Sequence, residues 1–197
     1  MAEEQQTASA GQGGVATATP VAEAATPPTA EPRQYARVLV VSAHPDDPEF
    51  SAGASVASLA RGGSEVYYCI CSDGSQGGED PSVPDAELTA RRYEEQRRAA
   101  STLGVKDVAF LGFRDGHLVA DLELRHAITA EIRRRQPDLV ITHSPVRNLA
   151  IGIGASHPDH LAVGEATLCA VYPDARNPRA FTDLLALGLE PHKVKEV

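Results

Sequence analysis

Short apolar runs alternate with longer amphipathic stretches along the chain from residue 37 onward. The run Val38-Leu39-Val40-Val41 is too short for a helix and rich in β-branched residues, so it predicts a buried parallel strand. By the same pattern we expect strands at 37–42, 65–71, 107–111 and 138–142. The remaining stretches predict helices at about 48–61, 86–103, 121–135 and 158–171.

This alternation predicts an α/β fold, a Rossmann-like doubly wound and mostly parallel sheet with helices on both faces. Such sheets bind ligands beyond the carboxyl ends of their strands. A dinucleotide site is a rival for that place, but it needs a glycine-rich turn after the first strand. Here the turn is His44-Pro45-Asp46-Asp47, which has no glycine and sets carboxylates where a pyrophosphate would lie. We therefore do not expect a dinucleotide.

Two regions of the chain differ in composition. Residues 1–36 consist largely of Ala, Thr, Pro, Gly, Gln and Glu, so we expect a disordered low-complexity tail that buries too little apolar surface to fold. Residues 37–197 predict one domain of ordinary size. Because the chain stops at Val197, inside an expected strand after Lys193, we expect C-terminal elements to be missing. An uncovered sheet edge would favour a homo-oligomer.

Charge and targeting signals narrow the classes of partner. The chain carries 18 Lys and Arg against 27 Asp and Glu, a net charge of −9, which disfavours nucleic acid and anionic membranes. No stretch approaches the roughly 20 apolar residues of a spanning helix. The start Met1-Ala2-Glu3-Glu4 lacks the basic and apolar regions of a secretory signal, so we expect a cytoplasmic protein.

The three cysteines do not suggest a zinc site of their own. Cys69 and Cys71 fall on one face of a predicted strand, and Cys169 lies far away in the sequence. Two thiols without a further Cys or His nearby are insufficient for a metal. We expect them to be buried apolar residues.

Two acidic-histidine clusters carry the candidate chemistry. His44-Pro45-Asp46-Asp47 follows the first predicted strand, and His157-Pro158-Asp159-His160 opens the last predicted helix. Together they offer two imidazoles and a carboxylate for one metal, with a further carboxylate and imidazole for acid–base chemistry. A simpler alternative is that His44 and Asp47 only cap the helix that follows them.

The order of these motifs resembles the PIG-L/LmbE family of metal-dependent N-deacetylases, which includes the mycothiol and bacillithiol pathway deacetylases. The resemblance covers most of the chain after about residue 36. The motifs that carry it are Ala43 to Asp47, Ser72 to Gly77, Arg92 with Glu95, Leu103-Gly104-Val105, Leu111 to Gly116, His157 to His160, Val171 to Asn177 and Glu190 to Val194.

The resemblance implies a role for each residue of the two clusters. It implies that His44, Asp47 and His160 bind the metal, which is Zn²⁺ or another divalent ion such as Fe²⁺ or Co²⁺. Asp46 is then the general base, and His157 donates to the oxyanion or to the leaving amine. We expect Asp159 to fix the tautomer of His157 and raise its pKa.

The same resemblance implies substrate contacts at Arg92 and Asp115, which suit sugar hydroxyls or a phosphate. For Arg92 the alternative is a solvated helix face with i,i+4 ion pairs. For Asp115 it is an ordinary Asp-Gly turn.

The implied activity is hydrolysis of the N-acetyl amide of a small amino-sugar conjugate, such as an N-acetylglucosaminyl compound. A rival with the same catalytic residues is an amidase that cleaves a thiol-conjugate amide. From a different class, the chain could be a non-catalytic metal-binding or interaction module. Asp46 and His157 argue against that class, because a pure binding site needs neither.

Overall fold

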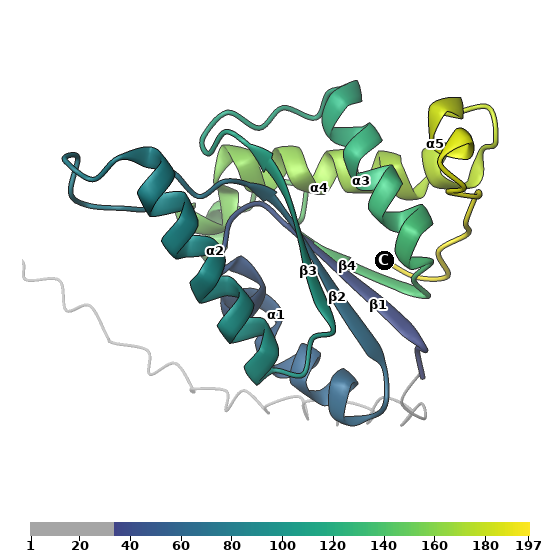
Figure 1. The fold of residues 1–197 in the computed structure, drawn as a ribbon, viewed down its shortest axis with the longest axis horizontal. Helices are drawn as coiled ribbons and strands as arrows, with labels where there is room; N and C mark the ends of the chain where they lie inside the picture. Colours follow the sequence, from purple (N-terminus) through teal and green to yellow (C-terminus); the bar gives the residue numbers. More distant parts are fainter. Residues whose placement is uncertain (1–33) are drawn as a thin grey trace, which may run out of the picture. The chain divides into compact units, whose positions relative to one another are not determined.

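The computed structural model describes residues 34–197, and its strands form one parallel sheet. The strands are β1 (Arg37–Ser42), β2 (Glu65–Ser72), β3 (Asp107–Phe113) and β4 (Leu139–Thr142), in the order β3-β2-β1-β4 (Figure 1). The four predicted strands are confirmed, with β2 and β3 extending slightly beyond their predicted ends.

Helices connect the strands as the amphipathic pattern predicted. The α-helices are α1 (Asp47–Arg61), α2 (Asp85–Thr102), α3 (Leu122–Arg135), α4 (Pro158–Val171) and the short α5 (Thr182–Ala186). Three 3₁₀ turns, at Leu149–Ile151, Ile153–Ser156 and Asp174–Arg176, were not predicted. Neither was α5, because segments this short carry little periodicity.

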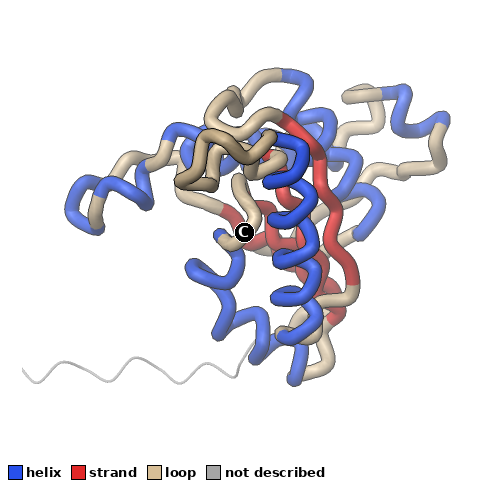
Figure 2. The backbone as a smooth tube through the Cα atoms, turned by 60° about the vertical axis from the view of Figure 1, so that its left-hand side comes forward, coloured by secondary structure: helices blue, strands red, loops and turns tan. Residues whose placement is uncertain are grey.

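The alternation of side chains along β1 divides the hydrophobic core between the two faces of the sheet. Val38 and Val40 belong to one cluster, with residues of α1 and α2. Leu39 and Val41 belong to a second cluster, with residues of α3 and α4. Each such side chain contributes about 1.5–3 kcal/mol on full burial. Figures 1 and 2 show the two helical layers with the sheet between them, so the doubly wound fold is confirmed.

The strand order locates the place where a ligand is expected. The chain passes from β1 to β2 and β3 on one side, then returns to place β4 on the other side of β1. The connections that leave β1 and β4 therefore diverge, and a crevice opens at the carboxyl ends of these two strands. Both acidic-histidine clusters lie near this end.

The remaining sequence predictions have mixed outcomes. Residues 1–33 of the predicted tail lie outside the described residues, so that prediction is untested. Cys69 and Cys71 are fully buried in the core, as expected. Glu196 forms a single parallel bridge with Leu139, in place of a longer strand after Lys193. Within residues 34–197, none of the helices combines the length and the apolar character that crossing a membrane requires.

Candidate metal centre and active site

The first cluster forms a tight turn between β1 and α1. The backbone N–H of His44 donates to Asp47 Oδ2 at 2.8 Å, and Asp46 takes φ 100° and ψ −31°. The N-cap residue Asp46 makes no side-chain hydrogen bond to the helix. Since the Asp47 carboxylate contacts imidazoles instead of the N–H groups of the first helical turn, the capping alternative is wrong.

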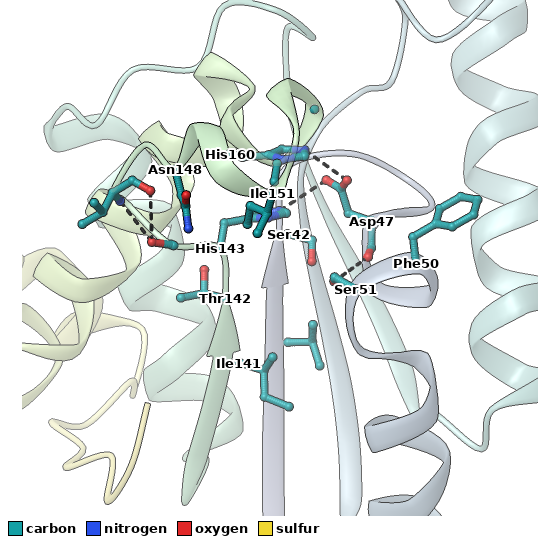
Figure 3. Close-up of a pocket in the computed structure, with 15 residues that line it drawn as sticks. Ser42, Asp47, Phe50, Ser51, Ile141, Thr142, His143, Asn148, Ile151 and His160 are labelled. Atoms are coloured by element: carbon teal, nitrogen blue, oxygen red, sulfur yellow. Dashed lines mark hydrogen bonds and ion pairs between the residues drawn. The ribbon is translucent and has the colours of Figure 1, made fainter. Parts of the chain in front are cut away.

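Asp47 lies between the other two predicted metal ligands. Its Oδ1 is 3.1 Å from His160 Nε2, and its Oδ2 is 3.3 Å from His44 Nδ1. Figure 3 shows His160 directed at Asp47 from the start of α4. Asp47 therefore contacts both His44 and His160, and the role of these three residues as metal ligands stays a prediction.

His143 belongs to the same cluster and was missed. Its Nε2 lies 3.3 Å from Asp47 Oδ2, and its ring stacks on that of His160 with centroids 4.1 Å apart and planes at 9° (Figure 3). Its position in the sequence could have indicated that His143 lies near the site. His143 is the first residue after β4, at the carboxyl end of the strand beside β1.

Ligand-type atoms within 4.8 Å of one another form three overlapping groups in the described part of the chain. The groups are His44, His157 and His160; Asp47, His143 and His160; and His44, Asp115 and Asp159. Of the three predicted metal ligands, His44 belongs to the first group, Asp47 belongs to the second, and His160 belongs to both. Imidazole nitrogen and carboxylate oxygen are ligands that suit Zn²⁺ and similar divalent ions.

The charges around this cluster favour a cation. Burial opposes protonation of His44, but the carboxylates of Asp115 and Asp47 outweigh it and raise the pKa of His44 to about 10. Burial also tends to raise the pKa of Asp47, yet contacts with His143, His160 and His44 hold it far below its usual range. A half-buried site that stabilises a positive charge this strongly fits a metal ion.

The side chain of Asp46 lines a different cavity from that of Asp47. Its side chain is 50% exposed, and its Oδ2 lies 3.0 Å from Arg92 Nη2. Partial burial raises the pKa of Asp46, and the adjacent Arg92 opposes the rise. Asp46 lines a polar cavity of about 430 Å³ together with His44, Gln76, Arg92, Asp115, His157 and His160.

His157 both caps α4 and faces the polar cavity. Its Nδ1 accepts a hydrogen bond from the Asp159 backbone N–H at 3.2 Å. In the neutral ring the proton is then on Nε2. Burial and nearby His44 lower the pKa of His157, against the opposing effect of Asp159. The expected rise of this pKa is therefore wrong.

The carboxylate of Asp159 has partners other than the His157 ring. It is 1% exposed, and Oδ2 lies 3.2 Å from His44 Nε2. It also accepts hydrogen bonds from the backbone N–H groups of Gly116 and Leu118. Asp159 thus orients His157 only through its backbone N–H, while its carboxylate supports the proposed metal ligand His44.

The two predicted substrate contacts both line the polar cavity. Arg92 donates to Asp46, to the Pro45 carbonyl and to Gly77 O, so it does not belong to the solvated face of α2. That face carries other i,i+4 pairs, Arg91 with Glu87 and Arg98 with Glu94. Asp115 is buried, accepts from Gln76 N and lies 3.1 Å from His44 Nε2. Burial raises the pKa of Asp115, but His44 and Gln76 lower it overall.

A second cavity, of about 420 Å³, lies on the other side of His160 and is mainly apolar. Figure 3 shows its lining, which includes Phe50, Ile141 and Ile151. Asp47 and His143 also border this second cavity, and His160 lines both cavities, so the candidate metal ligands lie between a polar and an apolar cavity.

The chain is similar to known proteins in sequence and in structure. Diacetylchitobiose deacetylase of Thermococcus kodakarensis is 35% identical over 82% of this chain and 58% of its own length. The probable N-acetyl-α-D-glucosaminyl L-malate deacetylase 2 of Bacillus anthracis is 31% identical over 81% of this chain and 73% of its own. The solved structure of N,N'-diacetylchitobiose deacetylase from Pyrococcus horikoshii matches with a TM-score of 0.75 and 33% identity, covering 81% of this chain and 57% of that one.

The chain spans a little over half the length of the two diacetylchitobiose deacetylases. A family model described as PIG-L, GlcNAc-PI de-N-acetylase, matches residues 39–171, which contain both clusters and most of the sheet. Since this match covers more than half of the chain, the protein belongs to the PIG-L family.

Proposed function

We propose that this protein is a metal-dependent hydrolase that removes the N-acetyl group from a small amino-sugar conjugate, giving acetate and a free amine. The observation that carries the proposal is the position of Asp46. Its half-exposed carboxylate stands in a polar cavity directly beside the convergent His44, Asp47 and His160. The names of these three relatives, all deacetylases, support the same substrate class.

We propose Zn²⁺ as the metal, held by His44, Asp47 and His160. Three protein ligands of this kind leave a position for water or substrate, and Fe²⁺ or Co²⁺ suits the same donors. When bound, such an ion polarises a carbonyl and lowers the pKa of a coordinated water.

Asp46 is the proposed general base. Partial burial raises the pKa of its carboxyl, which makes the carboxylate a better proton acceptor, and Arg92 limits that rise. The exposed half of the side chain lets it take a proton from an attacking water and return it to the leaving amine. Arg92 holds the carboxylate at Oδ2, which keeps it turned into the cavity.

His157 is the proposed donor to the developing oxyanion. The Asp159 N–H favours the neutral tautomer with its proton on Nε2, and the lowered pKa of His157 favours the neutral ring. A neutral imidazole N–H is a suitable oxyanion donor. Arg92 and Asp115 are the proposed contacts for sugar hydroxyls, since both line the polar cavity.

The test is acetate release from a panel of N-acetylglucosaminyl conjugates, with the protein before and after treatment with a chelator. We expect release that stops on chelation and returns when Zn²⁺ is added. The matched control is Asp46→Asn, which should keep the metal and lose the activity. Cleavage of thiol-conjugate amides in place of N-acetyl sugars would favour the amidase alternative. Metal binding without hydrolysis of either class would favour the non-catalytic module.

A further inference from the structure

The backbone of Asp46 adopts a conformation that its residue type rarely takes. At φ 100° it lies outside the regions open to most residues with a Cβ atom, and glycine is the usual residue there. Such a conformation persists only when the surroundings hold it in place. Because Asp46 is the proposed base, whatever holds its backbone also sets the direction of its carboxylate.

Gln96 of α2 holds the backbone of Asp46. The side chain of Gln96 is 2% exposed, and its Oε1 accepts a hydrogen bond from the Asp46 N–H at 2.6 Å. Its Nε2 donates to both carboxylate oxygens of Glu49, at 3.0 and 3.1 Å. An ionised carboxylate only accepts, so Glu49 determines which end of the amide faces Asp46.

A second residue of the same helix holds the other end of Asp46. Arg92 and Gln96 are four positions apart on α2 and therefore lie on one face. Arg92 contacts the Asp46 carboxylate and Gln96 contacts its N–H. A buried amide at position 96 costs free energy unless its hydrogen bonds are satisfied, and an apolar side chain would fill the space without that cost.

We infer that Gln96, oriented by Glu49, is a positioning residue that keeps the general base Asp46 in its strained conformation. The inference rests on the proposed function, since it assigns Gln96 a part in that reaction. Gln96 and Glu49 lie outside both acidic-histidine clusters. The inference gives the face of α2 that contacts the turn between β1 and α1 a role in catalysis.

The first experiment compares Gln96→Leu with the wild type on the best substrate of the panel. Loss of the acceptor frees the Asp46 N–H, so we expect kcat to fall about 10- to 100-fold, the scale expected for a misplaced catalytic group. KM should stay within about twofold, and the metal content per chain should not change. Glu94→Gln, on the solvent face of α2, is the control and should match the wild type.

The second experiment exchanges the two polar partners. Gln96→Glu alone sets two carboxylates against each other and should lose activity like Gln96→Leu. The double variant E49Q/Q96E places an acceptor beside the Asp46 N–H again, with an amide to donate to it. We expect recovery to within about threefold of the wild type, which a purely space-filling role for Gln96 does not predict.

The third experiment asks whether Gln96 acts through Asp46. In an Asp46→Asn background, Gln96→Leu should cost little further activity, because residues that act as a unit are not additive. Equal losses in both backgrounds, or failure of E49Q/Q96E to recover, would overturn the inference.

Hydrogen exchange of the Asp46 N–H separates this inference from the proposed function. Exchange should be slow in the wild type, fast in Gln96→Leu and slow again in E49Q/Q96E. If the wild type hydrolyses no N-acetyl sugar, the proposed function is wrong, and the catalytic role of Gln96 fails with it. If the wild type is active but exchange and kcat are unchanged in Gln96→Leu, only the inference about Gln96 is wrong.

Discussion

The sequence His-Pro-Asp occurs twice in this protein, and the two copies place their aspartates in opposite environments. Asp46, in the copy after β1, has a side chain 50% exposed to the polar cavity. Asp159, in the copy that opens α4, is 1% exposed and accepts hydrogen bonds from two backbone N–H groups. The carboxylate of Asp46 is therefore accessible from the cavity, while that of Asp159 is enclosed by protein.

The difference arises from where each helix begins. Helix α4 starts at Pro158, so Asp159 has helical geometry and turns toward the Gly116 segment. Helix α1 starts at Asp47, so Asp46 stands outside it with a positive φ. A shift of the helix start relative to the motif changes the direction of a side chain and, with it, the chemistry that the residue can perform.

The largest expected effect is loss of the proposed metal. His160→Ala should abolish stoichiometric metal binding and all hydrolysis, because it removes one of three proposed ligands. Elemental analysis of the purified variant measures this directly. Undiminished metal in His160→Ala would contradict the assignment of His160 as a ligand and would direct attention to His143 and His157, which share candidate groups with it.

Asp46→Asn should separate catalysis from binding. We expect turnover to fall by about 10²–10⁴, the range for a missing general base, while metal content stays at the wild-type level. Steady-state kinetics with metal analysis on the same samples measures both quantities. Near-wild-type turnover would reduce Asp46 to a residue that only orients its neighbours.

His157→Ala should cost about 10²–10³ in kcat if its Nε2–H stabilises the oxyanion. His157→Gln is the matched variant, since its amide can still donate a hydrogen bond, and it should lose less. Comparison of kcat for the two variants tests whether His157 acts as a hydrogen-bond donor to the oxyanion. Equal losses would show that the donor is not what matters at this position.

Among these variants, we expect Asp159→Ala to have the smallest effect on turnover and the clearest effect on the free energy of unfolding. Asp159→Ala leaves the Gly116 and Leu118 N–H groups without their acceptor, which should lower the free energy of unfolding by about 2 kcal/mol. Asp46→Ala should lower it far less. Denaturant unfolding of the two variants tests this contrast, and equal losses would contradict the distinction between the two copies.

Periodicity predicted the fold well because it reports which face of each element is buried. The four strands and the main helices follow from runs such as Val38-Leu39-Val40-Val41. The convergence of His44, Asp47 and His160 followed from motif resemblance combined with the expected strand ends.

What the sequence did not predict depends on contacts between distant segments. His143 enters the cluster because β4 pairs with β1, and Gln96 meets Asp46 because α2 packs against the turn after β1. The carboxylate of Asp159 contacts His44 because α4 begins beside the Gly116 turn. No periodicity encodes these partners, since each depends on the register in which two elements meet.

If the cluster at the junction of β1 and β4 binds the proposed metal, metal binding is linked to folding. The proposed ligands come from segments far apart in the chain and meet only when the sheet and α4 are in place. An ion that binds the native state alone shifts the folding equilibrium by mass action, by about 2.7 kcal/mol at a free concentration 100 times its Kd. The melting temperature of this protein should therefore rise with the free metal concentration, whether or not a substrate is present.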